Sequence, residues 1–199
     1  MKKSSLDIYE FLKSQNLLEN SPPLWWPNAG TFEVVISAIL TQNTTWKNVE
    51  KSLQNLEGYL ELESFLTLDI ENLKERIRPS GFYNQKAPRL LSLANNIKDK
   101  FKSFEKFQTE VTREWLLLQK GVGEESADAI LCYACLRDEM VVDSYTKRLL
   151  KSFDIEFKKY SQYKFFLEES LRKSFNQKEL SKILALYHGM IVEYNKSKL

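Results

Sequence analysis

The 199-residue sequence lacks the features that direct a chain to a membrane or a secretory route. It contains no run of about 18 apolar residues, the length that a membrane-spanning helix needs. Its first residues, MKKSSLDIYEFL, have neither the apolar core nor the cleavage site of a signal peptide. We therefore expect an intracellular, cytoplasmic protein that does not have a membrane partner.

Potential metal ligands of the soft or nitrogen type are also scarce. The chain has one histidine, His188, and two cysteines, Cys132 and Cys135. The CxxC spacing is shared by redox and metal sites. Here it lies within the apolar run LCYACL, and no second cysteine pair follows. This setting favours small apolar side chains packed inside a helix, and we predict no metal site.

Glycine and proline number only six and five, so the chain has few places where a helix must end. Apolar residues recur at helical spacing, and no segment shows the two-residue alternation typical of a strand. The breaks fall at residues 22–23, 27–30, 79–81 and 121–123. This pattern predicts an all-α protein of about ten helices with short connections.

The net charge of +2 does not by itself indicate a nucleic-acid-binding protein. The distribution of charge is more informative, because residues 74–113 contain ten Lys or Arg and four acidic residues. A local excess of this kind can line a surface that faces phosphates. Solvated helix faces have the same composition, so both interpretations stand for each residue.

The segment from Trp115 to Ile130 has an apolar helix, a tight Gly-Val-Gly turn and a second apolar helix. The amides after Gly123, together with the helix dipole, form a potential phosphate site. Lys120 and Ser126 flank this turn. Taken alone, the pattern also describes an ordinary helical hairpin.

Twenty residues after Gly123, the run Val141-Val142-Asp143-Ser144-Tyr145 places an aspartate at the start of the next helix. The simplest role for Asp143 is that of an N-cap. A catalytic role is compatible with it, because both roles need a carboxylate that is fixed at the start of a helix.

The hairpin followed by Asp143 resembles the helix-hairpin-helix (HhH-GPD) DNA glycosylase superfamily, in particular its endonuclease III-like group. Residues 39–44 (ILTQNT) and 80–87 (SGFYNQKA) resemble two further segments of that family, and all four segments occur in the family order. The resemblance implies two helical subdomains with a helix-hairpin-helix motif and an active-site cleft between them. The expected subdomains are 26–136, with the hairpin at about 110–136, and 1–25 plus 137–199.

The resemblance also implies roles for individual residues. Asp143 is the expected catalytic carboxylate, Gln42 is expected to fill the gap left by an extruded base, and Phe82 is the candidate wedge. The expected DNA contacts are Gln42, Phe82, Lys120, Gly121, Gly123 and Ser126. The partner is double-stranded DNA containing damaged bases, and the backbone carbonyls of the hairpin are candidate ligands for a monovalent cation.

The sequence departs from the family pattern at two places. Bifunctional members carry a lysine two residues after the second glycine of the hairpin, where this chain has Glu125. A carboxylate cannot form a Schiff base, so we expect base release without AP lyase activity. Many relatives end in four cysteines that hold an iron–sulfur cluster, but no cysteine follows Cys135 here, so no cluster is expected. For His188 a structural role is favoured over a catalytic one.

The tryptophans suggest the substrate. Trp25, Trp26, Pro27 and Trp46 are the predicted base-binding residues, although core packing is the alternative and only one of the adjacent pair need face the base. An aromatic surface stacks on an extruded base and attracts a cationic one. These residues and the cluster-free end most resemble the 3-methyladenine DNA glycosylase branch, which implies alkylated purines as substrates.

Two other functions remain open from the sequence. One is a glycosylase for oxidised pyrimidines or mismatched bases, and the other is a non-catalytic helix-hairpin-helix module that only binds DNA. In each case we expect a monomer that associates with the nucleoid through DNA.

Overall fold

A computed structural model describes residues 3–198, which are helical and contain no strand. The predicted all-α class is confirmed. The described residues form twelve α-helices, more than the expected ten or so. The difference comes from helices of four to seven residues, which span too few turns to show apolar periodicity. No helix within the described residues has the length and apolar character that a bilayer span needs.

The chain forms two compact units, one built from Gly30–Ile130 and one from the described residues of Met1–Ala29 and Leu131–Leu199. The sequence-based boundaries at 26 and 136 differ from these by a few residues. Trp26 and Tyr133, which lie near the two expected boundaries, pack together in the unit of the chain termini, with ring centroids 5.0 Å apart.

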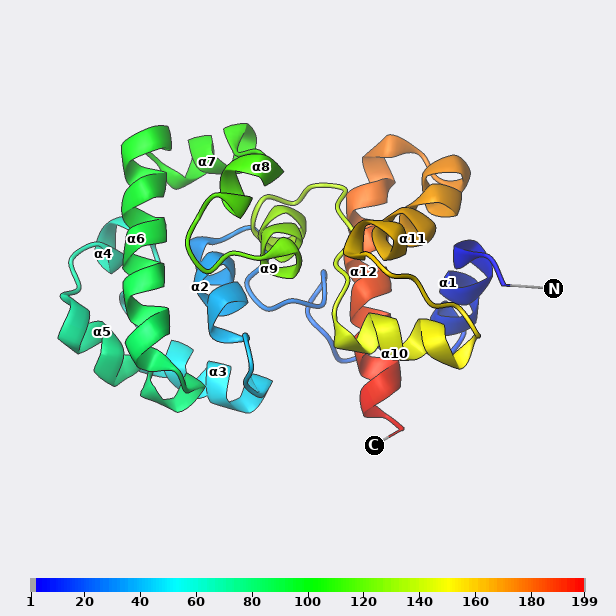
Figure 1. Ribbon diagram of the computed structural model, residues 1–199, viewed down its shortest axis with the longest axis horizontal. Helices are drawn as coiled ribbons and strands as arrows, with labels where there is room; N and C mark the ends of the chain where they lie inside the picture. The colour runs from blue at the N-terminus through cyan, green and yellow to red at the C-terminus, as the bar shows by residue number, and fades with distance from the viewer. Residues whose placement is uncertain (1–2, 199) are drawn as a thin grey trace. The chain divides into compact units, whose positions relative to one another are not determined.

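The unit of the termini is a four-helix assembly in which α12 contacts α1, α10 and α11 (Figure 1). Its core is apolar, with Leu12, Leu150, Leu167, Leu184 and Ile191 fully buried. The helices are α1 (Ser5–Lys13), α10 (Ser144–Ser152), α11 (Tyr160–Ser174) and α12 (Gln177–Lys196), and a π-helical turn spans Ile130–Ala134.

Side-chain caps fix where these helices begin. The Ser4 hydroxyl accepts from the Asp7 amide, and the Asp7 carboxylate accepts from the Ser4 amide, which forms a capping box at α1. The Asn176 side chain accepts from two amides at the start of α12. Asp143 caps α10 in the same way. Each such cap stabilises its helix by roughly 1 kcal/mol.

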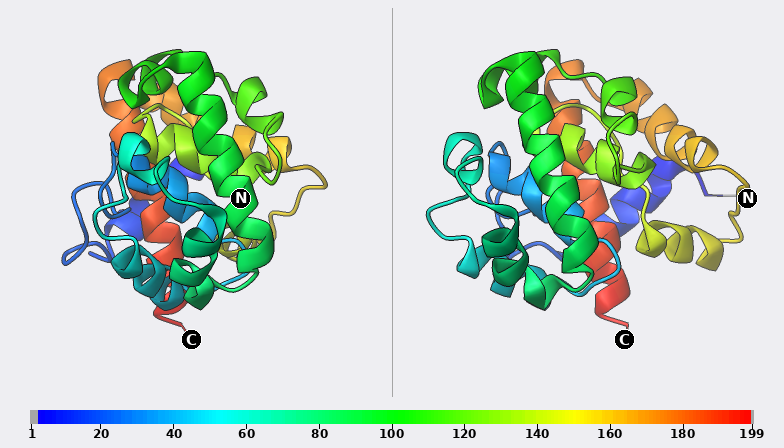
Figure 2. Two further views of the ribbon diagram at one scale, coloured as in Figure 1. Left: turned by 90° about the vertical axis from the view of Figure 1, so that its left-hand side faces the viewer. Right: turned by 60° about the vertical axis from the view of Figure 1, so that its left-hand side comes forward.

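The second unit, Gly30–Ile130, packs α2 against α3, α6 and α9, and both views in Figure 2 show α6 along much of its length. Aromatic rings fill its core, and Phe32 contacts both Phe65 and Phe104. The helices are α2 (Phe32–Leu40), α3 (Trp46–Asn55), α4 (Leu62–Phe65), α5 (Ile70–Arg76), α6 (Tyr83–Phe101), α7 (Phe104–Glu110), α8 (Arg113–Leu117) and α9 (Glu124–Ala129), with a 3-10 turn at Arg78–Ser80.

A buried ion pair joins the two helices of the hairpin, α8 and α9. The Arg113 guanidinium donates to both carboxylate oxygens of Asp128, at 2.7 and 3.2 Å, and Asp128 is fully buried. A bidentate pair of this kind fixes geometry as well as charge. The turn between the helices, residues 121–123, is therefore presented on a rigid base.

Candidate active site and DNA interface

Asp143 is held at the start of α10 by its own capping interactions. Its Oδ1 accepts hydrogen bonds from the Thr146 amide at 2.7 Å and from the Thr146 hydroxyl at 2.9 Å. The buried Val141 and Val142 precede it and anchor the chain on the core. The side chain is only 14% exposed, and the two hydrogen bonds to Oδ1 fix the rotation of the carboxylate.

Competing effects set the charge state of this carboxylate. Burial favours the neutral acid and raises the pKa of Asp143, whereas the nearby His188 and the two donors of Thr146 lower it. The net direction is a pKa below the usual value of an aspartate. Asp143 is therefore ionised at neutral pH, as a carboxylate that stabilises positive charge must be.

A buried polar cluster lies behind Asp143. The His188 Nε2 is 3.5 Å from the Asp143 Oδ2, and the His188 Nδ1 is 2.8 Å from the Tyr133 hydroxyl. That hydroxyl donates to the Ala185 carbonyl at 2.9 Å. Tyr133 belongs to the π-helical turn, a feature that often marks functional positions.

Trp25 lies beside the same histidine, in a strained backbone conformation. Its φ of 69° falls in the left-handed region, which a bulky residue rarely adopts. The indole meets His188 edge-on at 5.2 Å and donates from Nε1 to Glu193 Oε1 at 3.0 Å. Gly189 makes this approach possible, because a Cβ there would lie 2.4 Å from the Trp25 ring.

The three residues of the Trp-Trp-Pro motif differ in exposure. Trp26 is buried, 7% exposed, and packs on Tyr133, whereas Trp25 and Pro27 are half-buried. Of the two adjacent tryptophans, Trp25 therefore offers the more accessible ring, and Trp26 fills the core behind it.

In the other unit, the hairpin turn is packed under an arginine. Gly121 has a φ of 87°, and a Cβ added to it would lie 2.4 Å from the Arg89 Cδ. Only glycine fits both constraints. Arg89 belongs to α6, and its side chain lies over the hairpin turn. Gly123 is the N-cap residue of α9, whose first turn therefore has no side-chain cap.

Gln42 is joined to the same turn. Its Nε2 donates to the Gly121 carbonyl and to the Ser126 hydroxyl, both at 2.9 Å. One of the carbonyls considered for a monovalent cation is thus already an acceptor. The two hydrogen bonds connect the end of α2 with the hairpin and hold the Gln42 side chain in one direction.

A buried lysine connects α2 to the segment of Phe82. The Lys86 ammonium, 2% exposed, donates to the Leu40 carbonyl at 2.7 Å and to the Ser80 carbonyl at 2.8 Å. Burial lowers the pKa of Lys86 to about 8. Phe82, two residues after Ser80, has a φ of 48° and is 58% exposed.

The remaining residues predicted from the sequence are half-buried or exposed. Trp46 begins α3, is half-buried and donates from Nε1 to Glu50 Oε1 at 2.9 Å. Lys120 and Glu125 are exposed at either side of the hairpin turn. Cys132 and Cys135 do not form a disulfide, and burial raises the pKa of Cys135 to about 12, which leaves it largely protonated.

Comparisons with known proteins identify the family. Residues 36–173, more than half of the chain, match the family described as HhH-GPD superfamily base excision DNA repair protein. The chain belongs to this superfamily. A Methanocaldococcus jannaschii protein named as a DNA repair glycosylase is 42% identical over 181 residues, which are 86% of this chain and 80% of that protein.

Two solved structures extend the comparison. The H. pylori 3-methyladenine DNA glycosylase MagIII, bound to 1,N6-ethenoadenine, is 46% identical, covers 99% of both chains and has a TM-score of 0.94. Endonuclease III in a non-covalent DNA complex covers 95% of this chain and 85% of its own, with 22% identity and a TM-score of 0.70. The second likeness concerns the fold alone.

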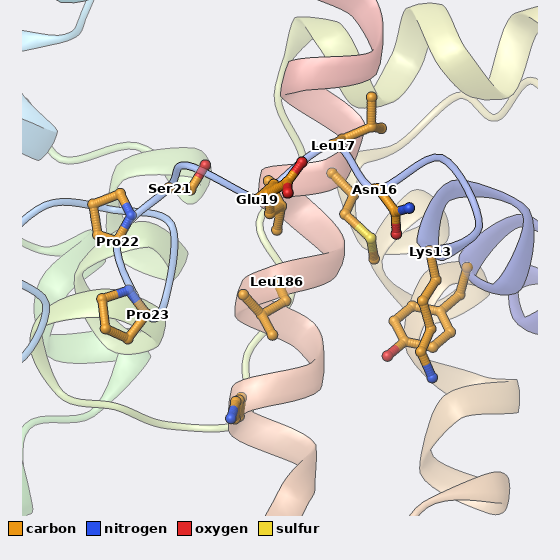
Figure 3. A pocket seen from close by; sticks show the side chains of 12 residues that line it. Lys13, Asn16, Leu17, Glu19, Ser21, Pro22, Pro23 and Leu186 are labelled. Carbon is orange, nitrogen blue, oxygen red and sulfur yellow. The ribbon is translucent and has the colours of Figure 1, made fainter.

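A hollow of about 600 Å³ in the unit of the chain termini lies apart from Asp143 and His188 (Figure 3). Leu186 and Met190 of α12 line it, together with Lys13, Pro22 and other residues of the first 23. At 100° per residue, Leu186 and Met190 face nearly opposite to His188 on the helix. The hollow is therefore on the side of α12 away from Asp143.

Several residues of these sites are not found by sequence reasoning. Arg89, Tyr133 and Glu193 have no local signal, because their partners are distant in the sequence. Gly189 had one, since an isolated glycine in a helix often marks a close approach. Lys86 had another, because it shares the spacing of the buried Leu90 and Leu93 on α6.

The position of Arg89 over Gly121 predicts a phosphate contact for the superfamily hairpin. We expect Arg89→Ala to weaken binding to any duplex and to reduce the slope of log affinity against log salt by about 1. Lys98→Ala is the matched control, because Lys98 lies on the same helix in an exposed ion pair with Glu63. A salt titration by fluorescence anisotropy measures both. An unchanged slope in Arg89→Ala would exclude the contact.

Proposed function

We propose that this chain is a monofunctional DNA glycosylase that hydrolyses the N-glycosidic bond of alkylated purines such as 3-methyladenine and leaves an abasic site. The observation that carries the proposal is a fixed, ionised carboxylate, Asp143, connected through His188 to an accessible tryptophan. This chain is also 46% identical to a 3-methyladenine DNA glycosylase over nearly its whole length.

The chemistry follows from the charge of Asp143. As the glycosidic bond lengthens, the sugar gains oxocarbenium character, and an anion beside it stabilises that charge. Asp143 also orients the water that attacks the sugar, since a carboxylate accepts its proton. The free base and an abasic site are the products.

The preference for alkylated purines follows from Trp25. Methylation at N3 or N7 gives the purine a positive charge, which makes it a good leaving group and attracts it to an aromatic face. The cation–π contribution is about 0.5–2 kcal/mol. The Lys196 ammonium already lies 5.9 Å from the Trp25 ring centroid, which is the same kind of interaction.

The proposal of base release without strand cleavage rests on Glu125, which stands where bifunctional relatives carry the attacking lysine. The absence of cysteine after Cys135 supports the proposal that no iron–sulfur cluster is bound. We propose that the hairpin, with Lys120, Gly121, Gly123 and Ser126, grips the backbone of duplex DNA. Gln42 and Phe82 then occupy the stack that the damaged base leaves.

We expect Asp143→Asn to lower the single-turnover rate of 3-methyladenine release by about 100-fold or more, because the amide keeps the cap but loses the charge. Asp69→Asn is a matched control, since Asp69 caps α5 through a 2.8 Å bond from the Asn72 amide. Lesion-DNA affinity and the thermal midpoint should change little in either variant. Full excision by Asp143→Asn would refute the assignment.

Glu125→Lys should introduce an amine at the position of the bifunctional lysine. Borohydride should then trap some of this variant on DNA that contains an abasic site, whereas the wild type gives no adduct. Glu124→Lys supplies the same charge one residue earlier and should not be trapped. Trapping of the wild type would contradict a monofunctional mechanism.

Aromatic recognition of a cation predicts selective losses. Trp25→Leu and Trp46→Leu should each reduce release of cationic 3-methyladenine more than release of neutral 1,N6-ethenoadenine, by about 2- to 30-fold in the ratio. Trp115→Leu is the control, because its ring packs on Phe101 and Phe107 in the core. Equal losses on both bases, in step with a lower melting temperature, would favour core packing. If the wild type released thymine glycol faster than 3-methyladenine, oxidised pyrimidines would be the favoured substrates instead.

A further inference from the structure

A buried nitrogen without a hydrogen bond stands out beside Asp143. His188 is 3% exposed, and its Nε2 is the one buried side-chain polar atom without a hydrogen-bond partner that the described residues contain. Its nearest charged neighbour is the Asp143 Oδ2, at 3.5 Å. That separation is longer than a hydrogen bond, yet short enough for a strong electrostatic interaction at a site with little water.

The other ring nitrogen has its proton assigned by geometry. The Tyr133 hydroxyl is 2.9 Å from the Ala185 carbonyl and 2.8 Å from the His188 Nδ1. A carbonyl oxygen only accepts, so the single hydroxyl proton points to Ala185. The Nδ1 must then donate to the hydroxyl oxygen, which means that Nδ1 carries a proton. Burial raises the pKa of Tyr133 well above its usual value, so the hydroxyl itself stays protonated.

The state of Nε2 follows from its neighbour. With Nδ1 protonated, a neutral ring would turn the lone pair of Nε2 toward the carboxylate, and two buried acceptors would face each other. An imidazolium ring instead points an N–H at Oδ2. The Trp25 indole, which meets the ring edge-on, is neutral and adds no charge.

We propose that His188 is a positioning residue, an imidazolium that keeps Asp143 anionic and fixes Oδ2 while Thr146 fixes Oδ1. This inference rests on the proposed catalytic role of Asp143. It replaces the structural role that the sequence favoured for His188. Because both ring protons are committed, His188 does not take a proton from the attacking water, and that task stays with Asp143.

Nuclear magnetic resonance tests the protonation state directly, because the chain has a single histidine. In nitrogen-15-labelled wild type at about pH 7, two-bond proton–nitrogen correlations should show both ring nitrogens protonated. In Asp143→Asn the ring should become neutral with the proton on Nδ1. A neutral ring with its proton on Nε2 in the wild type, or a pattern unchanged by Asp143→Asn, would overturn the proposal. These spectra do not depend on catalysis, so they are separable from failure of Asp143 in the excision assay.

The rate of 3-methyladenine release tests the function of the pair. Without the imidazolium, burial dominates and the acid limb of the Asp143-dependent rate should move to higher pH. His188→Gln should therefore move the midpoint of this acid limb, measured from single-turnover rates between about pH 3.5 and pH 7.5, upward by about one pH unit, a tenfold change in the ionisation constant. Tyr133→Phe removes only the hydroxyl and leaves the His188 ring in place, so it should shift the acid limb by a smaller amount. Equal losses across this pH range in His188→Gln, with a lower melting temperature, would indicate a purely structural residue and refute the proposal.

Discussion

A carboxylate that must stay ionised while largely removed from water is the constraint on which the unit of the chain termini depends. Burial of Asp143 favours the neutral acid, and the donors of Thr146, the start of α10 and the nearby His188 oppose it. The groups that retain the charge also fix its direction, because Oδ1 is bonded by two donors and Oδ2 faces the imidazole. The same geometry therefore serves the cap and the proposed catalytic role, and neither role competes with the other.

The unit of residues 30–130 meets a different requirement, which is to hold three exposed loops in one arrangement. The Lys86 ammonium bridges the carbonyls of Leu40 and Ser80, and Gln42 bridges the carbonyl of Gly121 and the hydroxyl of Ser126. Two charge-assisted hydrogen bonds offset much of the cost of burying an ammonium group. For Gln42 to enter a duplex, its two bonds to the hairpin must be exchanged for bonds to DNA. The proposed insertion of Gln42 would therefore be coupled to the conformation of the hairpin.

Local pattern was sufficient to predict the all-α class, the hairpin at 115–130 and a helix that begins after Asp143, because each depends on neighbours in the sequence. The short helices α4, α5 and α7 were not predicted individually, since four to seven residues carry little periodicity. The His188–Tyr133 bond and the packing of Trp25 on Gly189 were beyond prediction, because they join residues 55 and 164 positions apart.

The polar groups around Asp143 bear on which bases can leave. Release of a neutral purine needs a proton delivered to the ring, whereas an alkylated purine already carries the positive charge that such a proton would supply. In the proposed state both protons of His188 are directed at fixed partners, the Tyr133 hydroxyl proton is given to Ala185, and Glu193 accepts from the Trp25 indole. A cluster committed in this way stabilises the sugar cation but has no proton to give to the base. Such chemistry favours lesions that are charged before they bind, and an aromatic face such as that of Trp25 attracts the same lesions.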